Sequence, residues 1–434
     1  MLAMAAKLEW IQTPKHVFVV LPAVTLAEGE VQNRAWSADG AYLLVAASRP
    51  SKQLDLRLKP NPDTVGQGVE IVAWTSQSRQ VRRLWSTEEP SVKVFGMAWL
   101  HGTPWCIAEV RWVERPAEGP HELFGLLALN PATGVFAWVP GMDRLEDAPQ
   151  LFASPTGPSL VAVFLDQPPA ADGRSDPTGG VANFWTIGPD ARVQQRVRTS
   201  AAYAYGIAWS SDGGKWYVGS NYANAKSGSG DETLSEVLDD GSMRRVNATA
   251  YRAPVQPEPE LVLSPKETVA ARRKVRTPVS NLWLSSRAVT FHPDLLLSAD
   301  ARGGRLSPNG EWVFYLENLV AKIRPIVKLT DDQRRELFDQ LKQQAMRNAK
   351  QCATGLAIYT NDWDDFLPPA GMFGSVEPYL KNQDLMDGFN YTPPGLLNVT
   401  QLGNPAATAI GYVEGPDGRA VAYADGHVVW IANP

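Results

Sequence analysis

A short turn motif recurs along the first three quarters of the chain and constrains its fold more than any other feature. In its clear form an apolar residue is followed by Ser, any residue, Asp or Asn, and Gly, and then by an apolar strand pattern. The Asp-Gly or Asn-Gly pair supplies the positive φ that a tight hairpin turn needs. Each copy therefore predicts a strand, a tight turn and a second strand. The clear copies begin at Trp36, Trp209 and Leu306.

Three degenerate copies lie between them, at residues 98–102, 153–157 and 263–267. The six landmarks are spaced as four-stranded blades with loop insertions would be. Alternating apolar and polar residues between the landmarks predict outer hairpins, for example 69–74 with 80–85 and 184–187 with 193–197. We therefore predict six blades, or seven if residues 1–30 complete another.

The Ser-Pro-Asp-Gly form of the turn resembles the repeat of TolB-type and related bacterial β-propellers over roughly residues 30–328. The resemblance implies a mainly β fold, with a β-propeller domain over 1–328. Another all-β array, such as two sandwiches, is the alternative, although sandwiches do not require a recurrent turn at blade-like intervals.

The pattern changes at Thr330, where Thr330-Asp331-Asp332-Gln333 has the form of a capping box. The next segment runs without Pro to about Tyr359, and its apolar residues recur every three or four positions. That period predicts one long amphipathic helix. The apolar positions are Phe338, Leu341, Ala345, Ala349, Cys352, Leu356 and Tyr359.

Two further stretches follow this helix in order, one at 359–365 and one at 424–428, where Asp425-Gly426 predicts a hairpin turn. With Asn348, Lys350 and Gln351 they resemble a bacterial pseudopilin-like group related to type II secretion. The matching residues are Tyr359, Asn361, Asp362, Asp364, Asp365 and Ala424–Val428. The resemblance implies a small α+β pilin-like domain over 329–434, with one long helix and a short antiparallel sheet.

The chain departs from this family at the start of the helix. A pseudopilin carries a hydrophobic half-helix there, whereas residues 331–336 are Asp-Asp-Gln-Arg-Arg-Glu and cannot cross a bilayer. Elsewhere the longest uncharged stretch, 123–142, contains Pro131 and Pro140, which predict strand, turn, strand and not a membrane span. The apolar run 17–26 predicts a first strand, with a signal peptide cleaved after 25–27 as the alternative.

Motifs for catalysis are absent from the sequence, so we assign no catalytic residue and no cofactor. The five histidines, the last of them His427, form no metal-binding pair, and no nucleophile elbow or phosphate loop occurs. We interpret His427 as a packing or hydrogen-bonding residue. Calcium is the one metal considered, because Asp362, Asp364 and Asp365 offer oxygen ligands; a solvated turn explains them equally well. The pseudopilin resemblance points instead to Asp417 and Asp425.

Charge and cysteine content narrow the function classes further. A formal net charge of −5 gives no electrostatic footprint for nucleic acid. Cys106 and Cys352 fall in different predicted domains, so we expect no disulfide. The basic run 271–276 is either an exposed strand edge or an anion contact.

Together these features predict a non-enzymatic binding or assembly protein. The propeller would recognise a protein, peptide or glycan, and the pilin-like module would dock onto a filament, a secretion apparatus or a cell-surface structure. The resemblance favours an extracytoplasmic or surface location. Two alternatives stay open: a propeller hydrolase or lyase acting on carbohydrate or peptide, and a structural surface component. A fold alone does not decide among them.

Overall fold

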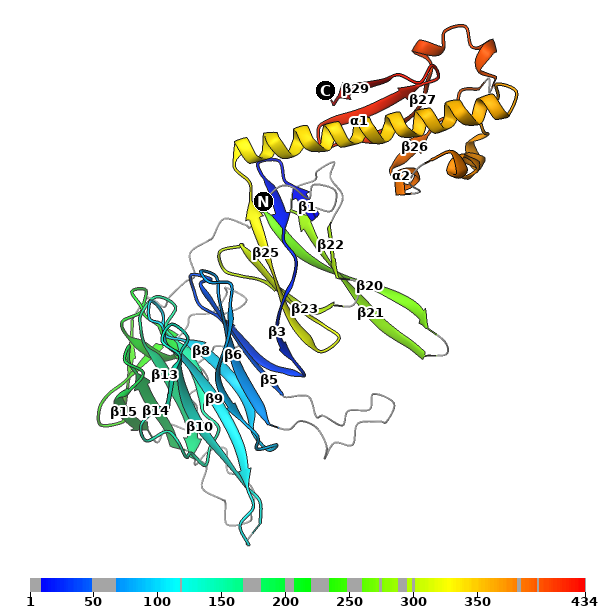
Figure 1. Cartoon of the computed structure of the whole chain (residues 1–434). Coiled ribbons are helices and arrows are strands. Elements are labelled where there is room, and N and C mark those ends of the chain that lie inside the picture. The colour runs from blue at the N-terminus through cyan, green and yellow to red at the C-terminus, as the bar shows by residue number, and fades with distance from the viewer. Residues whose placement is uncertain are drawn as a thin grey trace. The chain divides into compact units, whose positions relative to one another are not determined.

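The computed structural model describes residues 9–48, 68–117, 119–166, 181–199, 207–219, 234–247, 260–272, 275–287, 295–298, 301–380, 384–395 and 398–433. The chain divides into two compact units. The repeat unit comprises Pro22–Arg287 and Leu296–Ile326, and the helical unit comprises Met1–Leu21, Ala288–Leu295 and Val327–Pro434. The prediction of a mainly β chain is confirmed (Figure 1).

The repeat unit is built from antiparallel sheets whose strands follow one another along the chain. The first sheet pairs β4 (Val31–Trp36), β5 (Tyr42–Ser48), β6 (Val69–Thr75) and β7 (Val81–Thr87). The second pairs β8 (Lys93–Trp99), β9 (Cys106–Glu114), β10 (His121–Asn130) and β11 (Val135–Trp138). The third pairs β12 (Gln150–Ala153), β13 (Leu160–Asp166), β14 (Val181–Ile187) and β15 (Val193–Thr199). The fourth pairs β16 (Ile207–Trp209), β17 (Trp216–Gly219), β18 (Leu234–Val237) and β19 (Met243–Val246).

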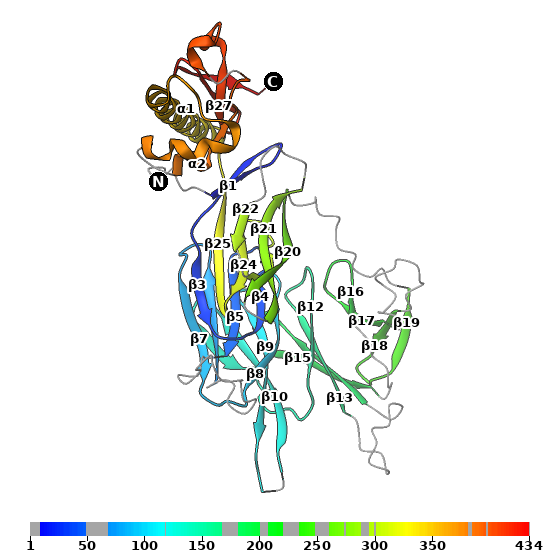
Figure 2. The same ribbon diagram turned by 90° about the vertical axis from the view of Figure 1, so that its right-hand side faces the viewer.

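The last two sheets depart from this simple meander. The fifth has three strands, β20 (Leu261–Arg272), β21 (Val275–Ser286) and β22 (Leu295–Ser298). The sixth pairs β23 (Ala301–Leu306), β24 (Trp312–Glu317) and β25 (Val320–Lys328). Its outer strand is β3 (Val24–Glu28) from the start of the repeat unit, antiparallel to β25 (Figure 2). The last sheet is thus completed by an early segment of the chain.

The predicted turns form as the motif requires. Gly40, Gly213 and Gly310 have φ of 70°, 69° and 72°, in the left-handed region that favours glycine. In the first copy the Ser37 hydroxyl donates to Asp39 at 2.6 Å and accepts from the Tyr42 amide at 2.9 Å. The Asp39 carboxylate in turn accepts from the Ala41 amide at 2.9 Å. These bonds satisfy the turn's own backbone, so the motif specifies the hairpin locally.

One degenerate copy was predicted wrongly. Residues 263–267 do not turn but lie inside β20, which pairs with β21 from Leu261 to Arg272. The copy lacks the Asp-Gly or Asn-Gly pair, so nothing in it supplies a positive φ. Pro265 is tolerated because β20 is an edge strand, where a missing amide donor breaks no ladder. The predicted basic run 271–276 spans the end of this hairpin, and its side chains lie outside the described residues.

Apolar side chains fill the space between neighbouring sheets of the repeat unit. Between the sixth and first sheets, the Trp74 and Trp312 rings lie 4.1 Å apart, and Phe314 is fully buried beside them. Other clusters join the first sheet to the second, the second to the third and the third to the fourth. Face-to-face packing of successive sheets is therefore the source of the core.

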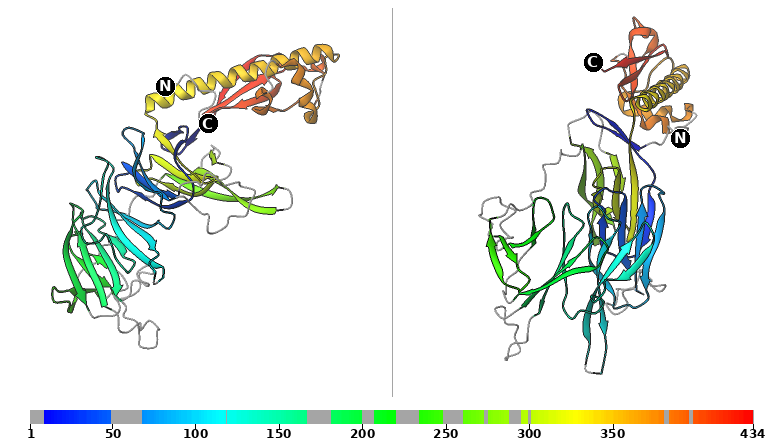
Figure 3. Two further views of the ribbon diagram at one scale, coloured as in Figure 1. Left: turned by 60° about the horizontal axis from the view of Figure 1, so that its bottom comes forward. Right: turned by 90° about the vertical axis from the view of Figure 1, so that its left-hand side faces the viewer.

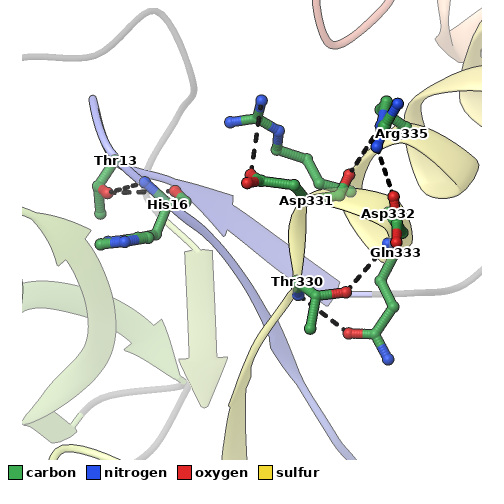
Figure 4. Close-up of polar contacts among 8 residues, drawn as sticks. Thr13, His16, Thr330, Asp331, Asp332, Gln333 and Arg335 are labelled. Carbon is green, nitrogen blue, oxygen red and sulfur yellow. Dashed lines mark hydrogen bonds and ion pairs between the residues drawn. The ribbon is translucent and has the colours of Figure 1, made fainter.

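The helical unit contains the predicted long helix. It is α1 (Asp331–Asp362), and Thr330 is its N-cap in a complete capping box with Gln333 (Figure 4). Asp332 pairs with Arg335 in the first turn. Ala345, Ala349, Cys352, Leu356 and Tyr359 are buried, as the period predicted. Among the described helices, none is both long and apolar enough to span a membrane.

Helix α1 lies along a four-stranded antiparallel sheet (Figure 3). The sheet contains β26 (Phe389–Tyr391), β27 (Ala409–Glu414), β28 (Gly418–Tyr423) and β29 (Val428–Ala432). Two short helices connect α1 to the sheet, η4 (Ala370–Tyr379) and α2 (Asp384–Asp387), and two others lie between β26 and β27, η5 (Val399–Gln401) and η6 (Pro405–Ala407). Asp425-Gly426 forms the turn between β28 and β29, as predicted, with a φ of 86° at Gly426.

The first two strands belong to the helical unit and not to the repeat. β1 (Glu9–Gln12) and β2 (Val17–Val20) form a hairpin whose turn is fixed by Thr13 and His16 (Figure 4). Val17 and Val19 pack on Leu337 of α1, and the Trp10 ring lies 6.0 Å from Phe338. The hairpin therefore covers the start of the helix. The sequence predicts a propeller domain over residues 1–328, and residues 9–21 group by their contacts with the helical unit.

Candidate binding site on the inner strands

The first strand of each sheet in the repeat unit lies at one edge of that sheet, and we call these strands the inner strands. β4 lies beside β8, and β8 beside β12, although each belongs to a different sheet. Because these strands pair on one side only, the other side leaves backbone groups and side chains available for further contacts. Inner strands are thus the place where several sheets present side chains together.

Two amide side chains of β4 attach it to β8. Gln32 accepts from the Val94 amide at 2.7 Å and donates to the Ser48 hydroxyl at 2.8 Å. The Asn33 amide donates to the Phe95 carbonyl at 2.5 Å. The Phe95 side chain itself is 49% exposed, which is unusual for an aromatic residue in a strand. The Arg111 guanidinium lies 5.5 Å from the centre of its ring.

Arg34, also in β4, points toward the sixth sheet. Its Nη2 donates to the Gly303 carbonyl of β23 at 3.3 Å, and its guanidinium lies 5.1 Å from the centre of the Phe314 ring. Arg305 pairs with Phe314 across β23 and β24, so two guanidinium groups share this junction. Burial, and then the charge of Arg305, lower the pKa of Arg34. Arg34 Nε is buried with no hydrogen-bond partner.

Glu109 is a carboxylate beside the inner strand β8. It lies in β9 opposite Gly96 of β8, where a Cβ would come within 3.1 Å of its carboxylate oxygen. Gly96 therefore leaves room for this side chain. Burial raises the pKa of Glu109 to about 7, because the charged form loses hydration there. Such a carboxyl can hold or release a proton near neutral pH.

A catalytic pair does not accompany Glu109 on the described inner strands. β4, β8, β12, β16 and β23 contain no Asp, Glu or His, whereas β20 contains Glu267, whose side chain lies outside the described residues. Glycosidase chemistry in most families requires two carboxyl groups about 5 to 10 Å apart. The described face therefore offers cationic, amide and aromatic groups, which bind, together with a single proton-holding group.

The aspartates considered for calcium belong to the helical unit. Asp362, Asp364 and Asp365 are exposed at the end of α1, where Asp364 and Asp365 have φ of 49° and 63°. Asp417 is exposed in the turn between β27 and β28, and Asp425 in the turn between β28 and β29. In the described part of the chain, no three His, Cys, Asp or Glu side chains are grouped to hold a metal ion.

The Asp425 turn has a packing explanation. The Asp425 carboxylate contacts the His427 ring and accepts from its backbone amide, and these bonds lower the pKa of Asp425. The His427 ring stacks on Tyr423 at 4.4 Å. Lys350 of α1 donates to the Gly426 carbonyl at 2.6 Å. Two of the motifs that resemble pseudopilins are thus joined by one hydrogen bond.

The two cysteines are buried and unbridged. Burial raises the pKa of both thiols, that of Cys352 to about 11. Neither is therefore poised as a nucleophile at neutral pH.

Sequence reasoning missed Arg34, Phe95, Glu109 and Arg305. The position of two of them relative to the turn motif could have identified them. Arg34 and Arg305 lie three and two residues, respectively, before the serine of such a motif. That places them on the strand that enters the turn, and in this fold it is the inner strand. Nothing in the sequence identified that strand as inner.

Comparisons with known proteins find β-propeller proteins as structural neighbours. A β-propeller domain of the Trilobed protease from Pyrococcus furiosus is 9% identical, with a TM-score of 0.29, over 67% of this chain and 78% of that one. TolB from Acinetobacter baumannii is 13% identical, with a TM-score of 0.25, over 67% of this chain and 64% of TolB. A gluconolactonase from Xanthomonas campestris is 14% identical, with a TM-score of 0.27, over 74% of this chain and 95% of the other.

No family model and no curated protein matches the chain. None of the three neighbours is pilin-like, so that assignment of the C-terminal residues stays a proposal. Likeness at these scores carries no functional argument, and the site rests on the contacts of this chain alone.

Proposed function

We propose that this chain is a non-enzymatic binding and assembly protein whose repeat unit is a six-bladed β-propeller. Its inner-strand face, defined by Asn33, Arg34, Phe95, Glu109 and Arg305, binds a partner protein or peptide. The observation that supports this proposal is the exposed Phe95 ring, which lies beside the Arg111 guanidinium of its own sheet, while Asn33 of the first sheet donates to the Phe95 carbonyl. Aromatic and arginine side chains are the groups that contribute most to protein interfaces.

The helical unit would attach the protein to a pilin-like filament, a secretion apparatus or another surface structure. Support comes from large apolar side chains exposed between residues 358 and 372. Trp363 and Met372 are 56% and 57% exposed, and Ile358 and Phe366 are 44% and 49% exposed. Apolar groups gathered in one segment are typical of a surface that a partner covers.

Capture of a native partner tests the inner-strand face. The full chain is immobilised and exposed to a surface extract of the organism that encodes it, and bound protein is identified by mass spectrometry. Phe95→Glu places a charge on the inner-strand face, so the partner should be lost. Phe136→Glu is the matched control, because Phe136 is 48% exposed on the outer strand β11. Loss with Phe136→Glu and retention with Phe95→Glu would refute the proposal.

A second capture experiment tests the helical unit. Trp363→Glu should release filament or surface material while leaving the partner of Phe95 bound. Val429→Glu is the control, since Val429 is 42% exposed on β29 and away from the 358–372 segment of the sequence. If the wild type, Trp363→Glu and Val429→Glu recover equal amounts of surface material, the proposed attachment is wrong.

Glu109 favours a second candidate, a propeller hydrolase or lyase. A carboxyl with a pKa of about 7 suits general acid–base catalysis. If the protein turns over a carbohydrate or peptide substrate, Glu109→Gln should abolish turnover while leaving binding intact. If the wild type turns over the substrate and Glu109→Gln does not, the enzymatic proposal replaces the binding proposal.

A further inference from the structure

We propose that Arg34 and Arg305 together bind a carboxylate of an acidic peptide segment at the junction of the sixth and first sheets. This inference rests on the proposed function, because it names the chemistry of the partner that the inner-strand face takes.

The first support is an uncompensated pair of charges. Two guanidinium groups share one junction, and neither has a carboxylate partner among the described residues. Like charges that lie close together destabilise a fold unless an anion lies between them. The chain as a whole carries a formal net charge of −5, so this positive pair is a local feature and not part of a basic surface.

The second support is the geometry of Arg34. Its Nη2 is held by the Gly303 carbonyl and its plane lies near the Phe314 ring, which together fix the orientation of the guanidinium. Its Nε is buried and donates to nothing. Because the buried Nε cannot reach a ligand, a carboxylate would contact the Nη donors, which a planar guanidinium presents in a fixed geometry. The remaining donors of Arg34 are thus positioned before a ligand arrives.

The third support concerns the kind of molecule that carries the carboxylate. β4 is the edge strand of its sheet, so its free side offers backbone donors and acceptors. A peptide presents alternating N–H and C=O groups that pair with such an edge, as a sugar chain does not. Phe95 on the neighbouring β8 adds an exposed ring for an apolar side chain. These features favour a peptide with acidic and apolar residues over an acidic glycan.

Fluorescence anisotropy with a labelled peptide tests the inference. The probe is Glu-Phe-Glu-Phe-Glu, compared with Gln-Phe-Gln-Phe-Gln, at fixed salt and with the full chain. The acidic peptide should bind more tightly than its amide counterpart. Arg34→Gln and Arg305→Gln should each weaken it about tenfold, the cost of one charged hydrogen-bonded contact. Arg192→Gln is the matched control, since Arg192 is exposed beside the β14–β15 turn, and should leave affinity unchanged.

A charge reversal guards against a variant that merely misfolds. Arg305→Glu replaces the repulsion with an internal ion pair to Arg34. It should abolish peptide binding while raising the midpoint of thermal unfolding. A lower midpoint, or peptide affinity equal to that of the wild type, would overturn the inference.

Other results of the binding and capture experiments also test the inference. Equal affinity for the Glu and Gln peptides, or tight binding of a galacturonate oligomer in place of the peptide, would overturn it. If a native partner is captured through Phe95 but the arginine variants bind the acidic peptide normally, only this inference fails. If the arginines bind the peptide and no native partner depends on Phe95, the proposed function fails and the carboxylate site stands.

Discussion

The contact between the N-terminal hairpin and helix α1 can be tested by shortening one side chain, with Leu337→Ala. Leu337 is 0% exposed and packs on Val17 and Val19, which are 1% and 4% exposed. Removing a buried leucine side chain costs 2 to 5 kcal/mol, depending on how far the site can collapse. A two-stranded hairpin can shift to fill part of the cavity, so we expect about 2 to 3 kcal/mol of lost stability in the helical unit.

Native-state hydrogen exchange of β1 and β2 measures this loss. Each 1.4 kcal/mol is a factor of ten, so their amides should exchange roughly 30 to 150 times faster in Leu337→Ala if the hairpin opens with the helix contact. Ile358→Ala is the control on the same helix, because Ile358 is 44% exposed and should change exchange little. Exchange that is equally fast in the two variants would refute the packing of the hairpin on α1.

Three other substitutions test local contacts. Burial raises the pKa of Glu109 to about 7 from its ordinary 4.5. The contribution of Glu109 to the free energy of unfolding is therefore fully present below about pH 4.5 and is lost as pH rises through 7. Glu109→Gln should therefore raise the free energy of unfolding at pH 8 by about 1 to 2 kcal/mol, discounted for partial solvation, as measured by urea unfolding at pH 5 and 8. Lys350→Met removes the 2.6 Å bond to the Gly426 carbonyl and should cost about 1 kcal/mol, seen as faster amide exchange in the β28–β29 turn. Ser37→Ala removes the hydroxyl that donates to Asp39, so the pKa of Asp39 should rise in an NMR titration and the unfolding free energy should fall by about 1 kcal/mol.

Each of these changes has a control of the same chemistry. Glu146→Gln removes an exposed carboxylate of the repeat unit, and Arg347→Met removes an exposed cation of α1. Ser78→Ala removes a turn hydroxyl that accepts only a 3.3 Å bond from Gln80. If a control changes the measured quantity as much as the variant it accompanies, the contact removed by that variant contributes nothing specific.

Local chemistry explains what the sequence could predict. The turn at Ser37 and the cap at Thr330 were readable because every group that forms them lies within a few residues. The copy at Ser264 failed because a degenerate motif without glycine has no local preference for a turn, and strand pairing with β21 then decided the conformation. A motif predicts its local structure reliably when its own residues form the hydrogen bonds of that structure. A degenerate copy that lacks those residues does not.

The candidate site was not readable in this way. Arg34 and Arg305 lie near opposite ends of the repeat unit's sequence, and long-range contacts such as β3 with β25 and Trp74 with Trp312 bring the first and last sheets together. The hairpin of β1 and β2 was missed as part of the helical unit for the same reason. Its apolar residues look like any first strand, and their partner Leu337 lies on a distant helix.

The two early partners of late segments, β3 with β25 and β2 with α1, also set an order of events during synthesis. Strands of the first four sheets can pair soon after they leave the ribosome, because their neighbours are close in sequence. Val17–Val20 and Val24–Glu28, in contrast, gain these contacts only after Val320 and Leu337 have been made. Until then β3 has no strand partner, whereas β2 can pair with β1 beside it in the sequence. Most of the repeat unit must therefore be synthesised before β3 acquires its strand partner.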